Sequence, residues 1–140
     1  MEVIEMKTVV CMVAIRKTRR GKEILLVRNE NVWMFPGGKP KMGEGEKECL
    51  IRELEVEELP GIKLKIGTRY CSIISRRARK GDKIRVIAYV GTVEGPLAPD
   101  SELTSARWLV LHPNLRKSGL CKVVGTVPHV IAMLKKDGLL

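Results

Sequence analysis

The chain of 140 residues contains no glutamine, three asparagines and only five aromatic residues. So few aromatic side chains argue against a stacking platform for single-stranded RNA, which needs aromatic rings within a basic surface. The four cysteines are scattered without any Cys-x-x-Cys pair, which argues against a zinc site or a disulfide framework. We therefore expect free thiols and a cytoplasmic protein.

We also expect no membrane-spanning or targeting segment. No apolar run approaches the length of a bilayer-spanning helix, and two glutamates precede the first strand-like run, unlike a signal peptide. The scarcity of Gln and Asn beside abundant Lys, Arg and Glu is typical of heat-adapted proteins, so we expect a thermophile source. The length and a hydrophobic fraction of 44% predict one domain spanning residues 1–140.

Charge is distributed unevenly along the chain. The net charge is +10, yet seven of the sixteen acidic residues lie between Glu44 and Glu58. Outside that segment the chain carries 24 Lys and Arg against 9 Asp and Glu. A concentration of carboxylates inside a basic protein indicates a site where divalent cations hold a polyanion.

The spacing around this segment is specific. Phe35-Pro36-Gly37-Gly38 is followed by five residues, then Glu44, then seven residues, then Arg52-Glu53-Leu54. This pattern, over residues of about 38–62, resembles the Nudix (MutT-like) hydrolases. The resemblance implies an α/β fold, an α/β/α sandwich with a mixed β-sheet. It also implies hydrolysis, dependent on Mg²⁺ or Mn²⁺, of the diphosphate linkage in a nucleoside diphosphate derivative or nucleoside triphosphate.

Helix geometry suggests which carboxylates bind metal. Hard cations prefer oxygen ligands, and residues four apart lie on one face of an α-helix. Glu53 and Glu57 have this spacing, so we predict both as metal ligands and catalytic residues. At about 100° per residue, Glu55 and Glu58 point away from that face, and we predict that they are solvated charges.

The end of the motif departs from the family pattern, in which a Glu-Glu pair follows after one free residue. Without gaps, Val56 replaces the first Glu of the pair and Glu57 is the second. With two single-residue insertions, Glu57 and Glu58 form the pair and Gly61 is the final glycine. An insertion inside an α-helix rotates all later residues by about 100°, so we expect the ungapped alignment, with Val56 a lost ligand.

The resemblance implies further site residues. A backbone carbonyl from the glycine turn helps to bind metal in the family, and this role falls on Gly37. We expect Arg52 to pair with Glu44 and hold the loop against the helix. The general base varies in place across the family, and Glu102, before a predicted strand, is our candidate, although it could also be an ordinary loop charge.

The predicted elements suit a mixed sheet between helices. Periodicity predicts a first helix over Glu46–Glu58 and a closing helix over Thr126–Lys136, with a loop over Trp33–Gly43 between strands and helix. We predict strands over Thr8–Ile15, Glu23–Val27, Lys63–Ile74, Lys83–Val93 and Arg107–Leu111.

A binding function is the alternative to catalysis. The basic residues between 76 and 85 form either a solvated hairpin or a surface that contacts RNA phosphates. The second hypothesis is therefore a Nudix-fold module that binds nucleotides or RNA with little or no turnover, and Val56 favours it. The oligomeric state and the identity of the nucleotide stay open.

Overall fold

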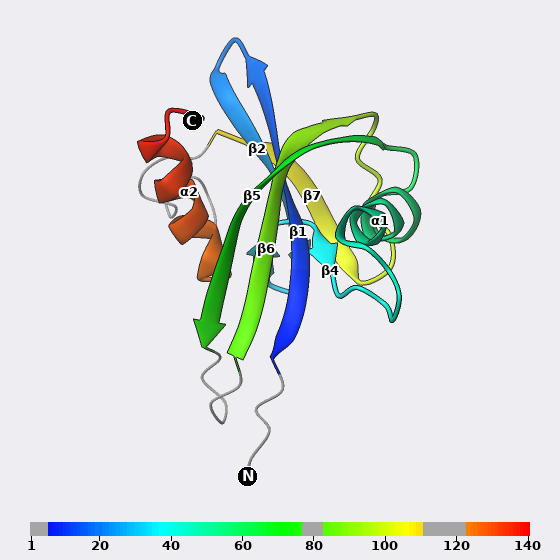
Figure 1. Ribbon diagram of the computed structural model, residues 1–140. Coiled ribbons are helices and arrows are strands. Elements are labelled where there is room, and N and C mark those ends of the chain that lie inside the picture. Colours follow the sequence, from blue (N-terminus) through cyan, green and yellow to red (C-terminus); the bar gives the residue numbers. More distant parts are fainter. Residues whose placement is uncertain (1–5, 77–82, 111–122) are drawn as a thin grey trace.

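A computed structural model describes residues 6–76, 83–110 and 123–140. Seven strands and two helical segments occur in these ranges, and the chain folds into an α/β/α sandwich as predicted (Figure 1). The strands are β1 Lys7–Thr18, β2 Gly21–Asn29, β3 Val32–Met34, β4 Gly37–Gly38, β5 Lys63–Arg76, β6 Lys83–Glu94 and β7 Leu103–Leu109. The helical segments are α1 Glu46–Leu50, continued without a break by η1 Ile51–Glu58, and the closing helix α2 Thr126–Lys136.

The sheet is mixed, with the order β3-β2-β1-β6-β5. Strands β1 and β6 are parallel, whereas β1–β2, β2–β3, β2–β7, β1–β4 and β5–β6 are antiparallel. The short β4 pairs with the middle of β1, since Gly37 lies opposite Cys11 and Gly38 opposite Val10. This pairing holds the glycine turn against the centre of the sheet, next to the first helix.

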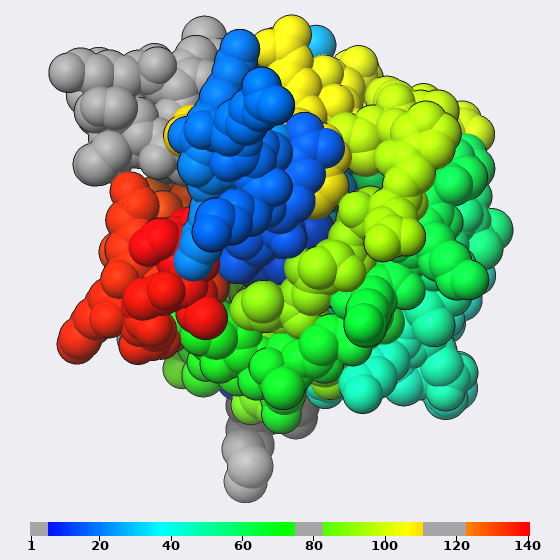
Figure 2. Space-filling view, turned by 90° about the horizontal axis from the view of Figure 1, so that it is seen from above, coloured from blue at the N-terminus to red at the C-terminus, as the bar shows by residue number. Residues whose placement is uncertain are grey.

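Both faces of the sheet are covered, so successive residues of the central strands alternate between two apolar cores. Cys11 and Val13 of β1 pack on the α2 side, whereas Val10, Met12 and Ala14 pack on the side of α1 and η1. Figure 2 shows the same arrangement from above, with the blue β1–β2 hairpin between red α2 and the green to cyan residues of the other layer.

The observed elements differ from prediction mainly in the loop between the first strands and the helix. The segment predicted as loop over Trp33–Gly43 contains parts of β3 and all of β4, which are too short to show periodicity. Strand β7 begins at Leu103 rather than Arg107, directly after Glu102. Residues 77–82, which include Arg77, Arg79 and Lys80, and residues 111–122 lie outside the described residues, so the choice between a solvated hairpin and an RNA contact is not tested.

No helix within the described ranges is long and apolar enough to cross a membrane. The three cysteines in those ranges, Cys11, Cys49 and Cys71, are free thiols, as predicted.

Candidate active site

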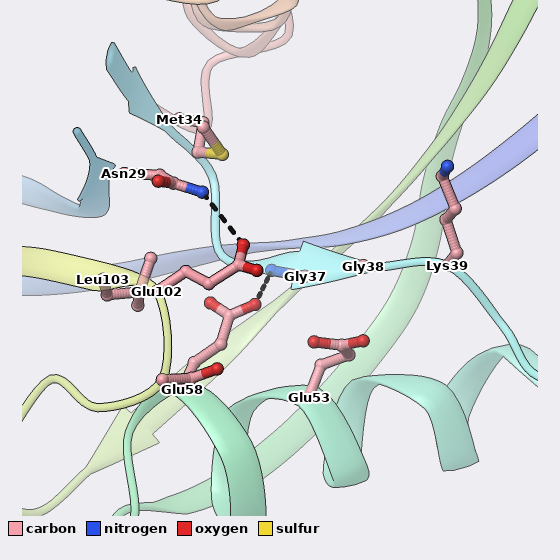
Figure 3. A pocket seen from close by; sticks show the side chains of 10 residues that line it. Asn29, Met34, Gly37, Gly38, Lys39, Glu53, Glu58, Glu102 and Leu103 are labelled. Carbon is pink, nitrogen blue, oxygen red and sulfur yellow. Dashed lines mark hydrogen bonds between the residues drawn. The ribbon is translucent and has the colours of Figure 1, made fainter. Parts of the chain in front are cut away.

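A cavity of about 320 Å³ opens between η1, β4 and the turn before β7 (Figure 3). We call it the carboxylate cavity, because it is lined by two glutamates of η1 and a third from the turn before β7. Its lining residues are Asn29, Met34, Gly37, Gly38, Lys39, Glu53, Glu58, Ser101, Glu102 and Leu103. Of the predicted site residues, Gly37, Glu53 and Glu102 therefore share one cavity.

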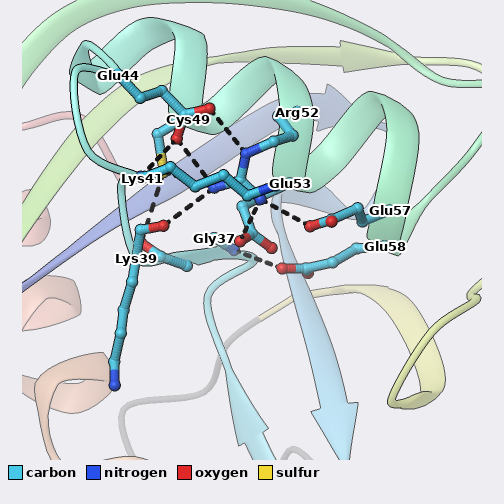
Figure 4. Close-up of polar contacts among 10 residues, drawn as sticks. Gly37, Lys39, Lys41, Glu44, Cys49, Arg52, Glu53, Glu57 and Glu58 are labelled. Carbon is cyan, nitrogen blue, oxygen red and sulfur yellow. Dashed lines mark hydrogen bonds and ion pairs between the residues drawn. The ribbon is translucent and has the colours of Figure 1, made fainter.

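Arg52 forms hydrogen bonds to several glutamates of this site (Figure 4). Its Nε and Nη2 donate to the two carboxylate oxygens of Glu44 at 2.7 and 2.9 Å, which is the predicted pairing between loop and helix. Its Nη1 donates to Glu53 at 3.0 Å and to Glu57 at 2.8 Å, and Nη2 also donates to the Lys39 carbonyl. The hydrogen bonds from Arg52 lower the pKa of Glu44 to about 2, which keeps that carboxylate ionised.

Glu53 lies against the glycine strand. Its side chain is 16% exposed, and a Cβ atom at position 38 would displace its carboxylate from the position that it has beside Gly38. Burial raises the pKa of Glu53 even though Arg52 acts in the opposite direction.

Glu58 overturns one prediction. The sequence analysis assigns it to solvent, but the residue is only 7% exposed and lines the carboxylate cavity. Its Oε1 accepts a hydrogen bond from the Gly37 backbone N–H at 3.2 Å, whereas its buried Oε2 has no hydrogen-bond partner in the described part of the chain. Burial raises the pKa of Glu58 to about 8. The prediction that Glu58 is a solvated charge is therefore wrong.

The reason is the shape of the helix. Segment η1 is a π-helix, in which backbone N–H groups bond five residues back, and Leu59 N donates to Leu54 O at 2.9 Å. This wider turn makes residues five apart neighbours on one face. Glu53 and Glu58 therefore meet in the cavity, and the chain absorbs one inserted residue without leaving the helix. The assumption of about 100° per residue, valid for an α-helix, fails here.

The Val56 side chain lies away from the candidate metal site. Its side chain is 65% exposed, and it does not line the carboxylate cavity. The gapped alignment, with Glu57 and Glu58 as the pair, agrees with the observed geometry. The interpretation of Val56 as a lost ligand stays a prediction, although its place outside the cavity does not favour it.

We expect Val56→Glu to leave both turnover and melting temperature nearly unchanged, because an exposed carboxylate outside the cavity neither meets a metal nor loses hydration. Kinetic assays and thermal melts of the same preparation measure the two quantities. A rise in turnover would contradict this placement and restore Val56 as a ligand position.

Glu57 lies near the site but outside the lining of the carboxylate cavity. Its side chain is 42% exposed and its Oε2 accepts from Arg52 Nη1, which also binds Glu53. Glu57 does not line the carboxylate cavity, so its role as a metal ligand stays a prediction. Glu46, which falls near the same stripe in an α-helical projection, instead accepts a hydrogen bond from Tyr89 Oη at 2.7 Å.

Glu102 reaches the cavity from the turn before β7. The backbone N–H of Asp100 donates to the Glu58 carbonyl at 2.8 Å, which ties this turn to the end of η1. Asn29 Nδ2 approaches the Glu102 carboxylate at 3.4 Å from the end of β2. Sequence reasoning missed Asn29 because only the pairing of β2 with β7 brings the two residues together.

The donor atoms suit a hard divalent cation. Glu53 and Glu58 supply carboxylate oxygens beside the Gly37–Gly38 backbone, and the buried Glu58 Oε2 has no partner among the described residues. Within the described ranges, no three His, Cys, Asp or Glu side chains are arranged as they would be around one ion. Arg52 explains part of this, since it draws the carboxylates of Glu53 and Glu57 toward its guanidinium group.

Comparisons with known proteins identify the family and the fold. Residues 6–118 match the family model described as NUDIX domain. A Nudix hydrolase from Nitrosomonas europaea superposes with a TM-score of 0.72 at 18% identity, covering 91% of this chain and 87% of that one. The E. coli ORF135 protein gives a TM-score of 0.65 at 22% identity, with 93% and 92% covered.

A third solved structure is an Ap4A hydrolase from C. elegans. It superposes with a TM-score of 0.67 at 17% identity, covering 93% of this chain and 96% of that one. At these identities the structural likeness shows the fold alone. No curated protein sequence matches the chain significantly.

Proposed function

Since the chain belongs to the Nudix family, whose domain model matches residues 6–118, we propose that it is a pyrophosphohydrolase. The proposed reaction is hydrolysis, with Mg²⁺ or Mn²⁺, of the diphosphate linkage in a nucleoside diphosphate derivative or nucleoside triphosphate. The observation that carries the proposal is the convergence of Glu53, Glu58 and Glu102 on one cavity beside the Gly37–Gly38 strand.

Electrostatics favours a cation-dependent reaction. The carboxylate cavity has three glutamates and Lys39 as its one basic residue among the lining residues described, so by itself it repels a diphosphate. A divalent cation supplies neutralisation of the phosphate oxygens and a more acidic water. Glu53, Glu58 and the Gly37 carbonyl would hold it, with Glu57 at the edge of the same site.

The remaining residues have roles of their own in this proposal. Glu102 faces Glu58 and Glu53 from the opposite wall, where it can accept a proton from the attacking water, so it is the candidate general base. Arg52 does not line the cavity, and it positions Glu53, Glu57 and Glu44 relative to one another. Cleavage of the phosphoanhydride then yields a nucleotide and a phosphate or phosphorylated fragment.

A non-catalytic binding module has lost its main support. Val56 suggested a missing ligand, but Glu58 lies in the cavity in its place. RNA contacts by the basic residues are not a basis for this alternative either, because residues 77–82 are outside the described part of the chain.

A hydrolysis screen tests the proposal, with products separated by chromatography so that nucleotides, pyrophosphate and sugar phosphates are detected as well as phosphate. Nucleoside triphosphates, nucleotide sugars and dinucleoside polyphosphates are incubated with Mg²⁺, with Mn²⁺ or with EDTA, at moderate temperature and at about 70 °C. We expect metal-dependent products from at least one class, and no products from Glu53→Gln. If fluorescent nucleotides bind but no nucleotide is cleaved under any condition, the chain is a binding module and the proposal fails.

A further inference from the structure

A second pocket continues from the carboxylate cavity. We call it the outer pocket; its volume is about 670 Å³, and both volumes lie within the usual range for small-molecule sites. Its lining residues are Asn29, Glu30, Val32, Met34, Glu102 and Val124. Asn29, Met34 and Glu102 line both spaces, and Figure 3 shows them on the side of the cavity away from Lys39. A substrate held in the carboxylate cavity can therefore extend past these three residues into the outer pocket.

The chemistry of the outer pocket differs from that of a phosphate site. Its described lining contains no Lys, Arg or His, and Lys39 lines only the carboxylate cavity. Glu30 and Glu102 supply carboxylate oxygens, and Asn29 supplies a carboxamide. Among the described lining residues, a second phosphate group would meet two glutamates and no basic side chain. The described lining therefore favours an occupant that is uncharged and offers hydrogen-bond donors.

The apolar walls favour a ring. Val32, Met34 and Val124 complete the lining of the outer pocket, and a methionine side chain adapts to the edge or face of an aromatic ring. A flat heterocycle with N–H groups satisfies both the apolar walls and the acceptor oxygens. We propose that the outer pocket binds the nucleobase of the substrate and that Glu30 selects bases carrying an exocyclic amino group.

The backbone at Glu30 supports a role for its side chain. Glu30 has a φ of 54° in the two-residue turn between β2 and β3, a conformation in which glycine or asparagine is preferred. Its carboxylate pairs with no Lys, Arg or His in the described residues at salt-bridge distance. Glu30 is exposed in this left-handed turn and lines the outer pocket, so its carboxylate is open to an external N–H donor.

This inference rests on the proposed function, since it assumes that the substrate is a nucleotide. The test compares bases that differ by one amino group, namely CTP with UTP and GTP with ITP. Steady-state kcat and KM are measured for hydrolysis, and affinities are measured by calorimetry with α,β-methylene analogues of the same nucleotides in the presence of Mg²⁺. The proteins are the unmodified chain, Glu30→Gln, Glu30→Gly and Glu94→Gln, which removes a charge at the exposed end of β6.

We expect the amino-bearing nucleotide of each pair to bind about tenfold more tightly, as a hydrogen bond to a charged acceptor commonly gives. Glu30→Gln and Glu30→Gly should bring each ratio close to one through KM, with kcat little changed, and Glu94→Gln should keep the ratio. Glu30→Gly should also raise the melting temperature, because glycine relieves the left-handed turn.

The outcomes separate the two proposals. If nucleotides are hydrolysed but the ratios are the same with and without Glu30, the outer pocket does not read the base and this inference is overturned. If the analogues bind with the expected ratio but no nucleotide is hydrolysed, the inference stands and the proposed hydrolysis fails. If no nucleotide binds or reacts, both fail.

Discussion

Glu58→Gln should reduce metal-dependent turnover by roughly a hundredfold or more while making the folded protein more stable. The first effect follows from the loss of a carboxylate ligand in the carboxylate cavity. The second follows because Glu58 is 7% exposed and one of its oxygens has no partner, so its charge opposes folding when no cation is bound. Assays with Mn²⁺ measure turnover, and thermal melts in EDTA should rise by roughly 2–6 °C.

The controls for this prediction lie on the same helix. Glu55→Gln removes the same charge outside the cavity, where Glu55 Oε2 accepts a hydrogen bond from Leu64 N at 3.0 Å and a glutamine oxygen can do the same. It should change turnover little. Glu53→Gln should match Glu58→Gln, whereas Glu57→Gln should cost less because Glu57 is half-exposed and lies outside the cavity lining. Equal losses at positions 55 and 58 would show that the π-helical register is wrong.

Arg52→Lys should lower both turnover and stability, even though it keeps the charge. Arg52 makes six hydrogen bonds, to three glutamates, the Lys39 carbonyl and Cys49 Sγ, from three nitrogens in a planar fork. A lysine ammonium group cannot meet these acceptors together. Neighbouring carboxylates would then repel one another, and we expect turnover to fall about tenfold or more and the melting temperature to fall by several degrees.

A double-mutant cycle identifies the pairing that matters. If Arg52 acts mainly by holding Glu44, then Arg52→Lys and Glu44→Gln should be strongly non-additive, and the double variant should be little worse than either single change. Simple additivity of the two effects on melting temperature would mean that the 2.7 and 2.9 Å contacts to Glu44 contribute little to the folded state.

Much of the fold was predictable because it depends on long periodic segments. The closing helix runs over Thr126–Lys136 as predicted, and the first helical segment spans Glu46–Glu58 when α1 and η1 are taken together. The pairing of Arg52 with Glu44 was also predictable, because the spacing of charged residues that it reflects lies within one loop and one helix.

The wrong prediction for Glu58 has a physical cause, and the spacing of leucines in the sequence indicates it. The buried leucines of this segment are Leu50, Leu54 and Leu59, spaced four and then five apart, and the second interval indicates a widened turn. The assumption of 3.6 residues per turn does not allow for such a widened turn. The contribution of Asn29 had no such local signal, because it depends on which strands pair across the sheet and on the turn before Leu103.

The sign of the charge in the carboxylate cavity has a consequence for the order of arrival at the site. The molecule as a whole is strongly basic, which favours the approach of anions, but three glutamates line the cavity in which the proposed reaction would place a diphosphate. Under the proposed function, a free nucleotide is attracted at long range but repelled inside the cavity. Only a nucleotide already complexed with its cation, or one that follows the cation, completes the approach, so uncomplexed nucleotide in excess should be a poor competitor.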